Sequence, residues 1–419
     1  MDDLGARLTS LGGLIVLLAM AFAMSERRSR ISVRLVLAGL GLQLVLAVAI
    51  FLTGIGDVLF EAADQAFAFF MEASNEGAQF VFGGLASDTI MKDGQPTGLS
   101  VGAIFGFQVL PLVVFFSALA GILYHLGITQ LVVRVLARIM QKAMNTSGAE
   151  SLGCALFIFL GIESTTAIAE YIRRMTRSEV FTLMTAFMAT VAGTVMGAYA
   201  VFGAAPGHLV TASLMSAPAA MVIAKMLIPE TEQPLTHGRV HFAPPKDTVN
   251  VIDAAARGAW QGLKLAATIG AMIIAFVGLV HLVNMILGAV SGVWMDDPLT
   301  LQRVMGWVFS PFAVIMGVPW EDAHVVGGLL GTKTILNEML AYQQLQMLVG
   351  EGAISARSVT IATYAVCGFA NFASIAILVG GLGMLDPDRK GLYARLGVRA
   401  LVAGTLAAFM TACYAGILA

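Results

Sequence analysis

Two glutamates and an asparagine stand inside stretches that otherwise have the composition of membrane-embedded helix. Glu163 follows the apolar run 152–160 and comes directly before three hydroxyl residues, whereas Glu338 and Asn371 lie in the last third of the chain. A carboxylate at the centre of a bilayer costs roughly 2.5 kcal/mol or more, so it persists where it meets a partner, a cation or a polar ligand. A carboxylate accepts two hydrogen bonds from a sugar diol, and an asparagine donates and accepts beside it. These residues therefore predict a binding site for a polar solute.

Each of these side chains also has a purely structural interpretation. Glu163 could be a buried hydrogen-bonded acid, Glu338 the solvated end of a short helix, and Asn371 a helix breaker that satisfies its own backbone. The ring of Phe369 could face a flat ligand, although phenylalanine at such a position is typical of packing. Lys333 precedes Glu338 closely enough for an ion pair.

The composition excludes a soluble domain. The chain has 419 residues, of which 58% are hydrophobic and 12% charged, with a mean hydropathy of +0.85. Soluble proteins carry about 25% charged residues. The 45 glycines fit a bundle of closely packed membrane helices. The net charge of −2 says nothing about nucleic acid, but no basic patch with interleaved aromatic residues occurs, so no nucleic-acid partner is predicted. The three cysteines lie far apart in apolar runs, so neither a disulfide framework nor metal-ligand spacing is indicated: Cys154, Cys367 and Cys413. No cofactor is expected.

The order of charges at the N-terminus sets the expected orientation. The apolar run 11–24 follows Asp2 and Asp3 and precedes four arginines within residues 27–34. A signal peptide has its positive region first, so this run is expected to be a membrane helix. Because positive loops stay inside, the first helix is predicted to run from outside to inside.

The sequence predicts an all-α polytopic membrane protein with eight transmembrane helices. An amphipathic interfacial helix is expected over residues 58–71. Two of the eight helices are interrupted by polar or small residues, and the first of these begins with the capping-box pair Thr176 and Glu179. The second begins near Arg357. The continuous helices are expected at about residues 8–25, 32–53, 104–126, 208–228, 262–288 and 398–418.

Two further segments, 151–171 and 320–348, are too polar and too short to span as single helices. A span needs about 20 apolar residues, so each is predicted to be a re-entrant hairpin. Each follows an amphipathic stretch and precedes a broken helix. The hairpins are expected to enter from opposite faces, which is the inverted-repeat plan of secondary transporters. The predicted division is 1–127 for scaffold helices with the interfacial helix, 128–228 for the first transport repeat, 229–298 for a cytoplasmic loop and scaffold helix, and 299–419 for the second transport repeat.

Four motifs resemble those of the concentrative nucleoside transporter family. They lie in the same order along nearly the whole chain, at residues 175–181, 188–195, 337–338 and 368–372. The resemblance implies a homotrimer in the bilayer, in which helices 1, 2, 3 and 6 form a scaffold around a moving, elevator-type transport domain. It implies a cation-coupled importer (symporter) of nucleosides in the bacterial inner membrane. With eight crossings, both termini are expected outside.

The resemblance also implies roles for individual residues. Glu338 and Asn337 of the second hairpin, with Phe369, Asn371 and Ser374, would hold the ribose. The tip of the first hairpin and one residue of the broken helix would face the base, at positions Gly161, Ile162, Glu163 and Val195.

This chain departs from the family at the first hairpin tip. The family commonly has Gly-Gln, one further residue and then Glu, whereas this chain has Gly161-Ile162-Glu163, which is one residue shorter. Recognition of the base is therefore the altered part of the predicted site. An unusual nucleoside or a sugar-like solute is the alternative cargo.

The same comparison bears on the coupling ion. Sodium-coupled relatives have a side-chain oxygen in the first hairpin, but residues 156–159 offer none here. Sodium prefers several oxygen ligands, as other hard cations do. A proton, carried by Glu163 or Glu338, is therefore favoured over a sodium ion near Thr190. The candidate coupling residues are Thr190, Val191, Leu160 and Glu163.

An intramembrane enzyme and a passive channel are the two alternatives to a transporter. An intramembrane enzyme needs a nucleophile beside a base, and the embedded segments contain no such Ser-His or paired-Asp pattern, so no catalytic residue is predicted. A passive channel fits poorly with two dead-ended hairpins, which suit alternating access.

Overall fold

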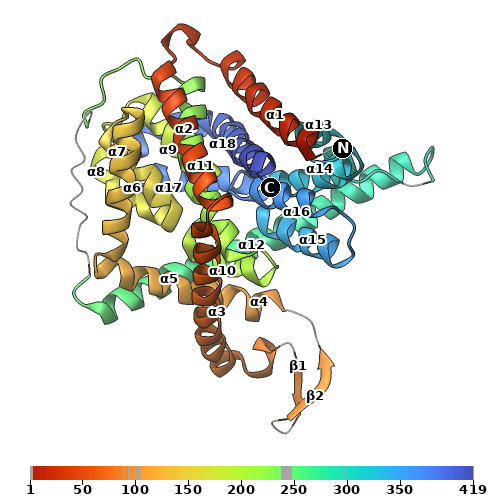
Figure 1. Ribbon diagram of the computed structural model, residues 1–419. Coiled ribbons are helices and arrows are strands. Elements are labelled where there is room, and N and C mark those ends of the chain that lie inside the picture. The colour runs from red at the N-terminus through yellow and green to blue at the C-terminus, as the bar shows by residue number, and fades with distance from the viewer. Residues whose placement is uncertain are drawn as a thin grey trace.

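Long and mainly apolar runs form most of the helices of this protein (Figure 1). The computed structural model describes residues 3–87, 89–92, 95–100, 104–236, 248–296 and 298–418. The side chains of Asp3, Glu163, Thr166 and the strand residues lie outside the described part. Within these described ranges, seven helical segments are long and apolar enough to cross a membrane, and the broken helix of α16 and α17 is the eighth span that the sequence predicts.

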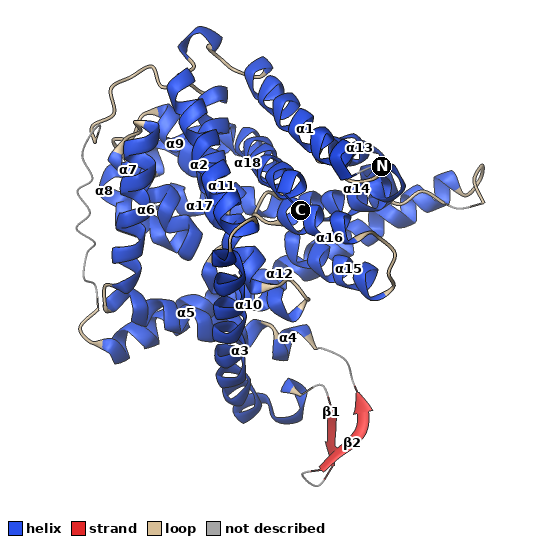
Figure 2. Ribbon diagram, in the orientation of Figure 1, coloured by secondary structure: helices blue, strands red, loops and turns tan. Residues whose placement is uncertain are grey.

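The N-terminal part contains three long helices and one small sheet. The helices are α1 (Asp3–Ala23), α2 (Val33–Phe51) and α3 (Gly54–Phe82), with short 3-10 turns at Arg28–Arg30 and Gly83–Ala86. The α3 helix has 29 residues, so the interfacial helix expected over 58–71 is twice as long as predicted. Strands β1 (Thr89–Lys92) and β2 (Gln95–Ser100) pair antiparallel, an element that the all-α prediction missed (Figure 2).

Helices α5 and α12 form a close pair. The short α4 (Phe105–Gln108) leads into α5 (Leu110–His125), and α12 (Val251–Ser291) has 41 residues instead of the predicted 27 or so. A Cβ atom at Gly258 would lie 2.4 Å from the Ser117 carbonyl oxygen, so only glycine allows this approach. The apolar window of α12 is only 6% buried within the chain, which leaves most of this helix for lipid or another subunit.

Two sets of elements repeat in the same order. The first comprises α6 (Ile128–Met144), α7 (Gly148–Phe159), η3 (Ile162–Ile168), α8 (Ala169–Ile172), α9 (Arg177–Ala189), α10 (Gly193–Val201) and α11 (Pro206–Leu227). The second comprises α13 (Leu301–Ile315), α14 (Trp320–Ile335), α15 (Glu338–Gly350), α16 (Ala356–Val366), α17 (Phe372–Leu385), η4 (Pro387–Arg389) and α18 (Lys390–Leu418).

The returning arms of the two hairpins differ. In the second hairpin α15 is a regular α-helix, as predicted. In the first hairpin η3 is a 3-10 segment and only α8, four residues long, is α-helical.

The core lies between α9, α11 and α18. The apolar window that covers α9 and α10 is 94% buried, in contrast to that of α12. Helices α1 and α2 pack against α18 and α11, and α5 packs against α12. The predicted division at residues 127, 228 and 298 stays a prediction, because packing within one chain does not reveal which elements move together.

An ion cluster connects the turn after α1 with α9 and α18. The carboxylate of Glu26 accepts two hydrogen bonds from Arg177, at 2.5 and 2.7 Å, and also pairs with Arg399. The Arg177 guanidinium holds the pKa of Glu26 below its usual value. Since these groups are partly exposed, the cluster orients the elements more than it stabilises them.

Candidate functional site

The tips of the two hairpins line one cavity. Gly161 and Ile162 come from the first tip, and Asn337 and Glu338 come from the second. The broken helices supply the remaining walls: Phe187, Ala192, Thr194, Val195 and Tyr199 from the first repeat, and Phe369, Asn371, Ala373, Ser374 and Ile377 from the second. Helix α12 closes the cavity with Leu265, Thr268, Ile269 and Met272. The cavity is thus apolar with a few convergent polar groups, as small-molecule sites usually are.

The second tip is shaped by Asn337. This residue caps α15, because its Oδ1 accepts a hydrogen bond from the Leu340 amide at 2.9 Å. The break after α14 therefore places Glu338 at the first position of α15. The positive end of the helix dipole favours a carboxylate there.

The break between α16 and α17 depends on a glycine. Gly368 has a φ of +123°, and a Cβ at this position would lie 2.9 Å from the carbonyl oxygens of Met188 and Ala189. The chain can therefore run against the end of α9 only with glycine here. Asn371 then caps α17, since its Oδ1 accepts from the Ser374 amide at 2.8 Å.

The polar centre of the cavity is Glu338. One carboxylate oxygen accepts a hydrogen bond from Tyr199 Oη, and the other accepts from Asn371 Nδ2 at 3.0 Å. Glu338 is only 4% exposed, so it is not the solvated helix end that was the alternative. Three elements, α10, α15 and α17, thus meet at one carboxylate, and two repeats contribute to it.

Two hydrophobic walls flank this centre. The ring of Phe369 stacks on that of Phe187, with 5.4 Å between the ring centroids and 28° between the planes. Both rings also line the cavity, so Phe369 takes part in packing and remains available to a ligand. Val195 lines the cavity from the first turn of α10.

The predicted coupling residues lie behind and beside the cavity. Thr190 is buried at the α9–α10 break, and its hydroxyl donates to the Ala186 carbonyl at 2.8 Å and reaches that of Phe157 at 3.5 Å. Val191 donates its amide to Ser213 Oγ at 3.2 Å. Leu160 lines a second, adjoining cavity. The Glu163 side chain lies outside the described residues.

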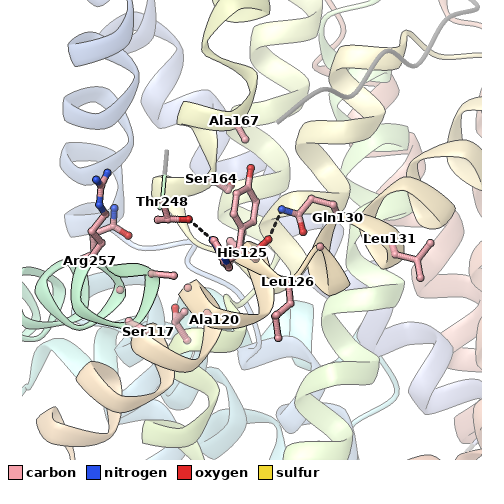
Figure 3. Close-up of a pocket in the computed structure, with 18 of the residues that line it drawn as sticks. Ser117, Ala120, His125, Leu126, Gln130, Leu131, Ser164, Ala167, Thr248 and Arg257 are labelled. Carbon is pink, nitrogen blue, oxygen red and sulfur yellow. Dashed lines mark hydrogen bonds between the residues drawn. The ribbon is translucent and has the colours of Figure 1, made fainter. Parts of the chain in front are cut away.

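The second cavity is larger, at about 680 Å³ (Figure 3). It lies between α5, α6, η3 and α12, and Thr194 lines both cavities. Its walls are polar: His125 Nδ1 lies 2.6 Å from Thr248 Oγ1, and Gln130 Nε2 donates to the Tyr124 carbonyl. Arg134 and Arg257 also line it. Sequence reasoning did not predict this cavity.

All of the predicted substrate residues whose side chains are described reach the first cavity. Tyr199 was missed, although it donates a hydrogen bond to Glu338. No cluster of three or more His, Cys, Asp or Glu side chains that could hold a metal ion occurs among the described residues.

Two hairpins with meeting tips, each followed by a broken helix, define a secondary transporter. The chain belongs to the concentrative nucleoside transporter family. Residues 12–85 and 208–416 match the models of the N-terminus and C-terminus of Na⁺-dependent nucleoside transporters, and residues 106–206 match a nucleoside recognition model. The family consists of transporters and not of enzymes, as the sequence predicted.

The relatives include proteins from bacteria and mammals. An uncharacterized transporter of Haemophilus influenzae is 41% identical over 98% of this chain and 97% of its own. Sodium/nucleoside cotransporter 1 of Homo sapiens is 37% identical over 98% of this chain, but this chain spans only 64% of its length. The structure of CNTnw in an inward-facing substrate-bound state has a TM-score of 0.89 and 39% identity, covering 99% of this chain and 98% of that one.

Proposed function

We propose that this protein is a cation-coupled importer of nucleosides. The observation that carries the proposal is the pairing of Glu338 with Asn371 in the cavity between the two hairpin tips. A carboxylate and an amide side by side offer the acceptors and the donor that a ribose diol needs. Family membership and the name of one mammalian relative, Sodium/nucleoside cotransporter 1, support the same cargo.

The proposed pose divides the cavity between ribose and base. Glu338, Asn337, Asn371 and Ser374 would bind the ribose, with Phe369 against its face. The base would lie toward the first hairpin and α10, against Gly161, Ile162, Glu163 and Val195. Both groups line one cavity, apart from the Glu163 side chain, which lies outside the description.

A second cargo class is favoured by one residue. Ile162 lines the cavity where the family pattern has a polar residue, and an isoleucine cannot hydrogen-bond to a base edge. An atypical nucleoside or a sugar-like compound would make the hydrogen bonds of the ribose half of the site and would form few polar contacts in the base half.

A thermal-shift screen tests the cargo directly. The purified protein is heated with nucleosides, nucleobases and free sugars, because a ligand that binds only the folded form raises the melting temperature. A rise with nucleosides but not with nucleobases is expected. A screen in which only free sugars raise the melting temperature would favour the second cargo class.

The transport movement is proposed to be of the elevator type. In this proposal the repeats over 128–228 and 299–419 move, and α1, α2, α5 and α12 form the fixed scaffold. The large outward-facing surface of α12 would contact the other subunits of a homotrimer. The larger cavity beside the site would be the cytoplasmic exit. The protein would lie in the bacterial inner membrane with both termini outside.

Protons are the proposed coupling ion. Thr190 is the one residue with a side-chain hydroxyl among residues 190–192, which separate α9 from α10, and its contacts are two backbone carbonyls. In membrane vesicles without sodium, a protonophore is therefore expected to abolish concentrative nucleoside uptake, and an inward sodium gradient at constant pH is expected not to restore it. Uptake that persists with the protonophore, or that returns with sodium, would contradict proton coupling.

Tyr199 is expected to orient Glu338 for the ribose. Replacing it with phenylalanine removes the hydrogen bond to the carboxylate, and a hydrogen bond to a charged group contributes about 1.5–3 kcal/mol. The apparent KM for nucleoside uptake should therefore rise about tenfold, since tenfold corresponds to about 1.4 kcal/mol. Tyr342→Phe is the matched control, because the Tyr342 hydroxyl donates to the Thr363 carbonyl and not to Glu338. Equal KM values for the two variants would refute the orienting role.

A further inference from the structure

Lys333 is a cation in the interior of the second hairpin, and the proposed mechanism makes no use of it. It lies in the last turn of α14 and is 1% exposed. Its ammonium donates to the Ala365 carbonyl at 2.9 Å. Burial of an unpaired ammonium is very costly, so this position requires compensation.

The compensation comes from the end of a broken helix. Ala365 is in the last turn of α16, which ends at Val366. The last carbonyl groups of a helix have no intrahelical partner and carry the negative end of its dipole. The Lys333 ammonium therefore lies where the chain leaves orphan carbonyl oxygens that attract a cation.

Glu338 balances the same charge from a greater distance. Among the described residues Lys333 forms no ion pair with a carboxylate, but Glu338, five residues later at the start of α15, acts on it electrostatically. The Lys333 ammonium thus compensates both the negative end of α16 and the carboxylate of Glu338, which is proposed to bind the ribose.

The first repeat has a corresponding contact without a charged residue. There Thr190 Oγ1, just after α9, reaches the Phe157 carbonyl in the last turn of α7, 33 residues away. In the second repeat Lys333 in the last turn of α14 reaches Ala365 near the end of α16, 32 residues away. Each contact joins the outer arm of a hairpin to the end of the following half-helix. The Lys333 ammonium thus joins the same pair of elements that the Thr190 hydroxyl joins in the first repeat, with the donor on the hairpin arm instead of at the end of the half-helix.

We propose that Lys333 is a tethered cation, which occupies in the second repeat a position that a mobile cation would otherwise have to fill. It holds the end of α16 and positions Glu338, so the second repeat needs no coupling ion of its own. This inference rests on the proposed function for its transport consequences, but its effect on the folded protein does not depend on the cargo.

The test removes the positive charge of Lys333 by substitution and then offers a sodium ion from solution in its place. Lys333→Gln keeps a donor for the Ala365 carbonyl but removes the charge, and Lys333→Ser also opens space. Without the tethered charge, both variants should lose about tenfold in nucleoside uptake in choline chloride, equivalent to about 1.4 kcal/mol. Sodium chloride at the same ionic strength should restore that uptake and raise the melting temperature of both variants. The wild type and Lys333→Arg should respond equally to the two salts.

The melting temperature separates this inference from the proposed function. If the wild type does not bind nucleosides, the proposed function fails, but the sodium-specific stabilisation of Lys333→Gln still tests the lysine. Wild-type uptake by both neutral variants in choline would overturn the proposal. Loss of uptake or of folding that sodium does not reverse would also overturn it, because it would mean that Lys333 acts only through packing.

Discussion

Glu338→Gln is expected to lower the affinity for a ribonucleoside about 100-fold, since the carboxylate would make two charge-assisted hydrogen bonds to the ribose and each contributes about 1.5–3 kcal/mol. Glutamine keeps the shape of the side chain and its bond distance to Asn371, so the fold should survive the change. Glu338 is only 4% exposed, so water cannot reach the site to make up for the hydrogen bonds that the charged carboxylate would lose. The measurements are the KM for uptake and the nucleoside-induced rise in melting temperature.

The matched control for this variant is Glu351→Gln. Glu351 follows α15 on the same hairpin but is exposed, so its charge should not affect the ligand. The loss at Glu338 should also be larger for a nucleoside than for the free base, because only the nucleoside has a ribose. Equal melting shifts for the wild type and Glu338→Gln would remove the ribose assignment.

The sequence predicted the parts of the site that local chemistry determines. Thr176 and Glu179 form the expected capping box, because the Thr176 hydroxyl accepts from the Glu179 amide at 3.1 Å and the Glu179 carboxylate accepts from the Thr176 amide at 2.8 Å. Asn337 and Asn371 likewise interrupt helices through hydrogen bonds within three residues. Such signals lie in short windows and are visible in a sequence.

The missed features depend on packing across the chain. Tyr199 reaches Glu338 over 139 residues, and no short motif marks that contact. The 3-10 conformation after Leu160 follows from hydroxyl groups that bond their own backbone: Ser164 Oγ donates to the Gly161 carbonyl and Thr165 Oγ1 to the Ile162 carbonyl. The capping box of Ser147 and Glu150 at the start of α7 was visible as Ser-x-x-Glu but was not recognised.

Lys225→Met is expected to cause the largest loss of stability outside the cavity. The Lys225 ammonium lies 2.7 Å from Glu150 and 3.2 Å from Glu230, and it donates to Ser178 Oγ at 3.0 Å. Lys225 is 6% exposed and Glu150 2%. Removing one partner of a buried ion pair costs about 3–5 kcal/mol, because the other charge stays buried without compensation. The melting temperature in detergent should therefore fall markedly.

The ion cluster around Lys225 lies at the base of the first hairpin, so its loss should also lower the rate of transport. Glu150 caps α7, Ser178 lies in the first turn of α9, and Lys225 is in the last turn of α11, so one ammonium joins the base of the first hairpin to two core helices. Ser147 Oγ also donates to Glu179, which connects the two capping boxes. If the cost arises from the uncompensated carboxylate, then Lys225→Met with Glu150→Gln should recover much of the melting temperature lost by Lys225→Met alone. A double variant whose loss of stability relative to the wild type equals the sum of the two single losses would show that the charges act independently.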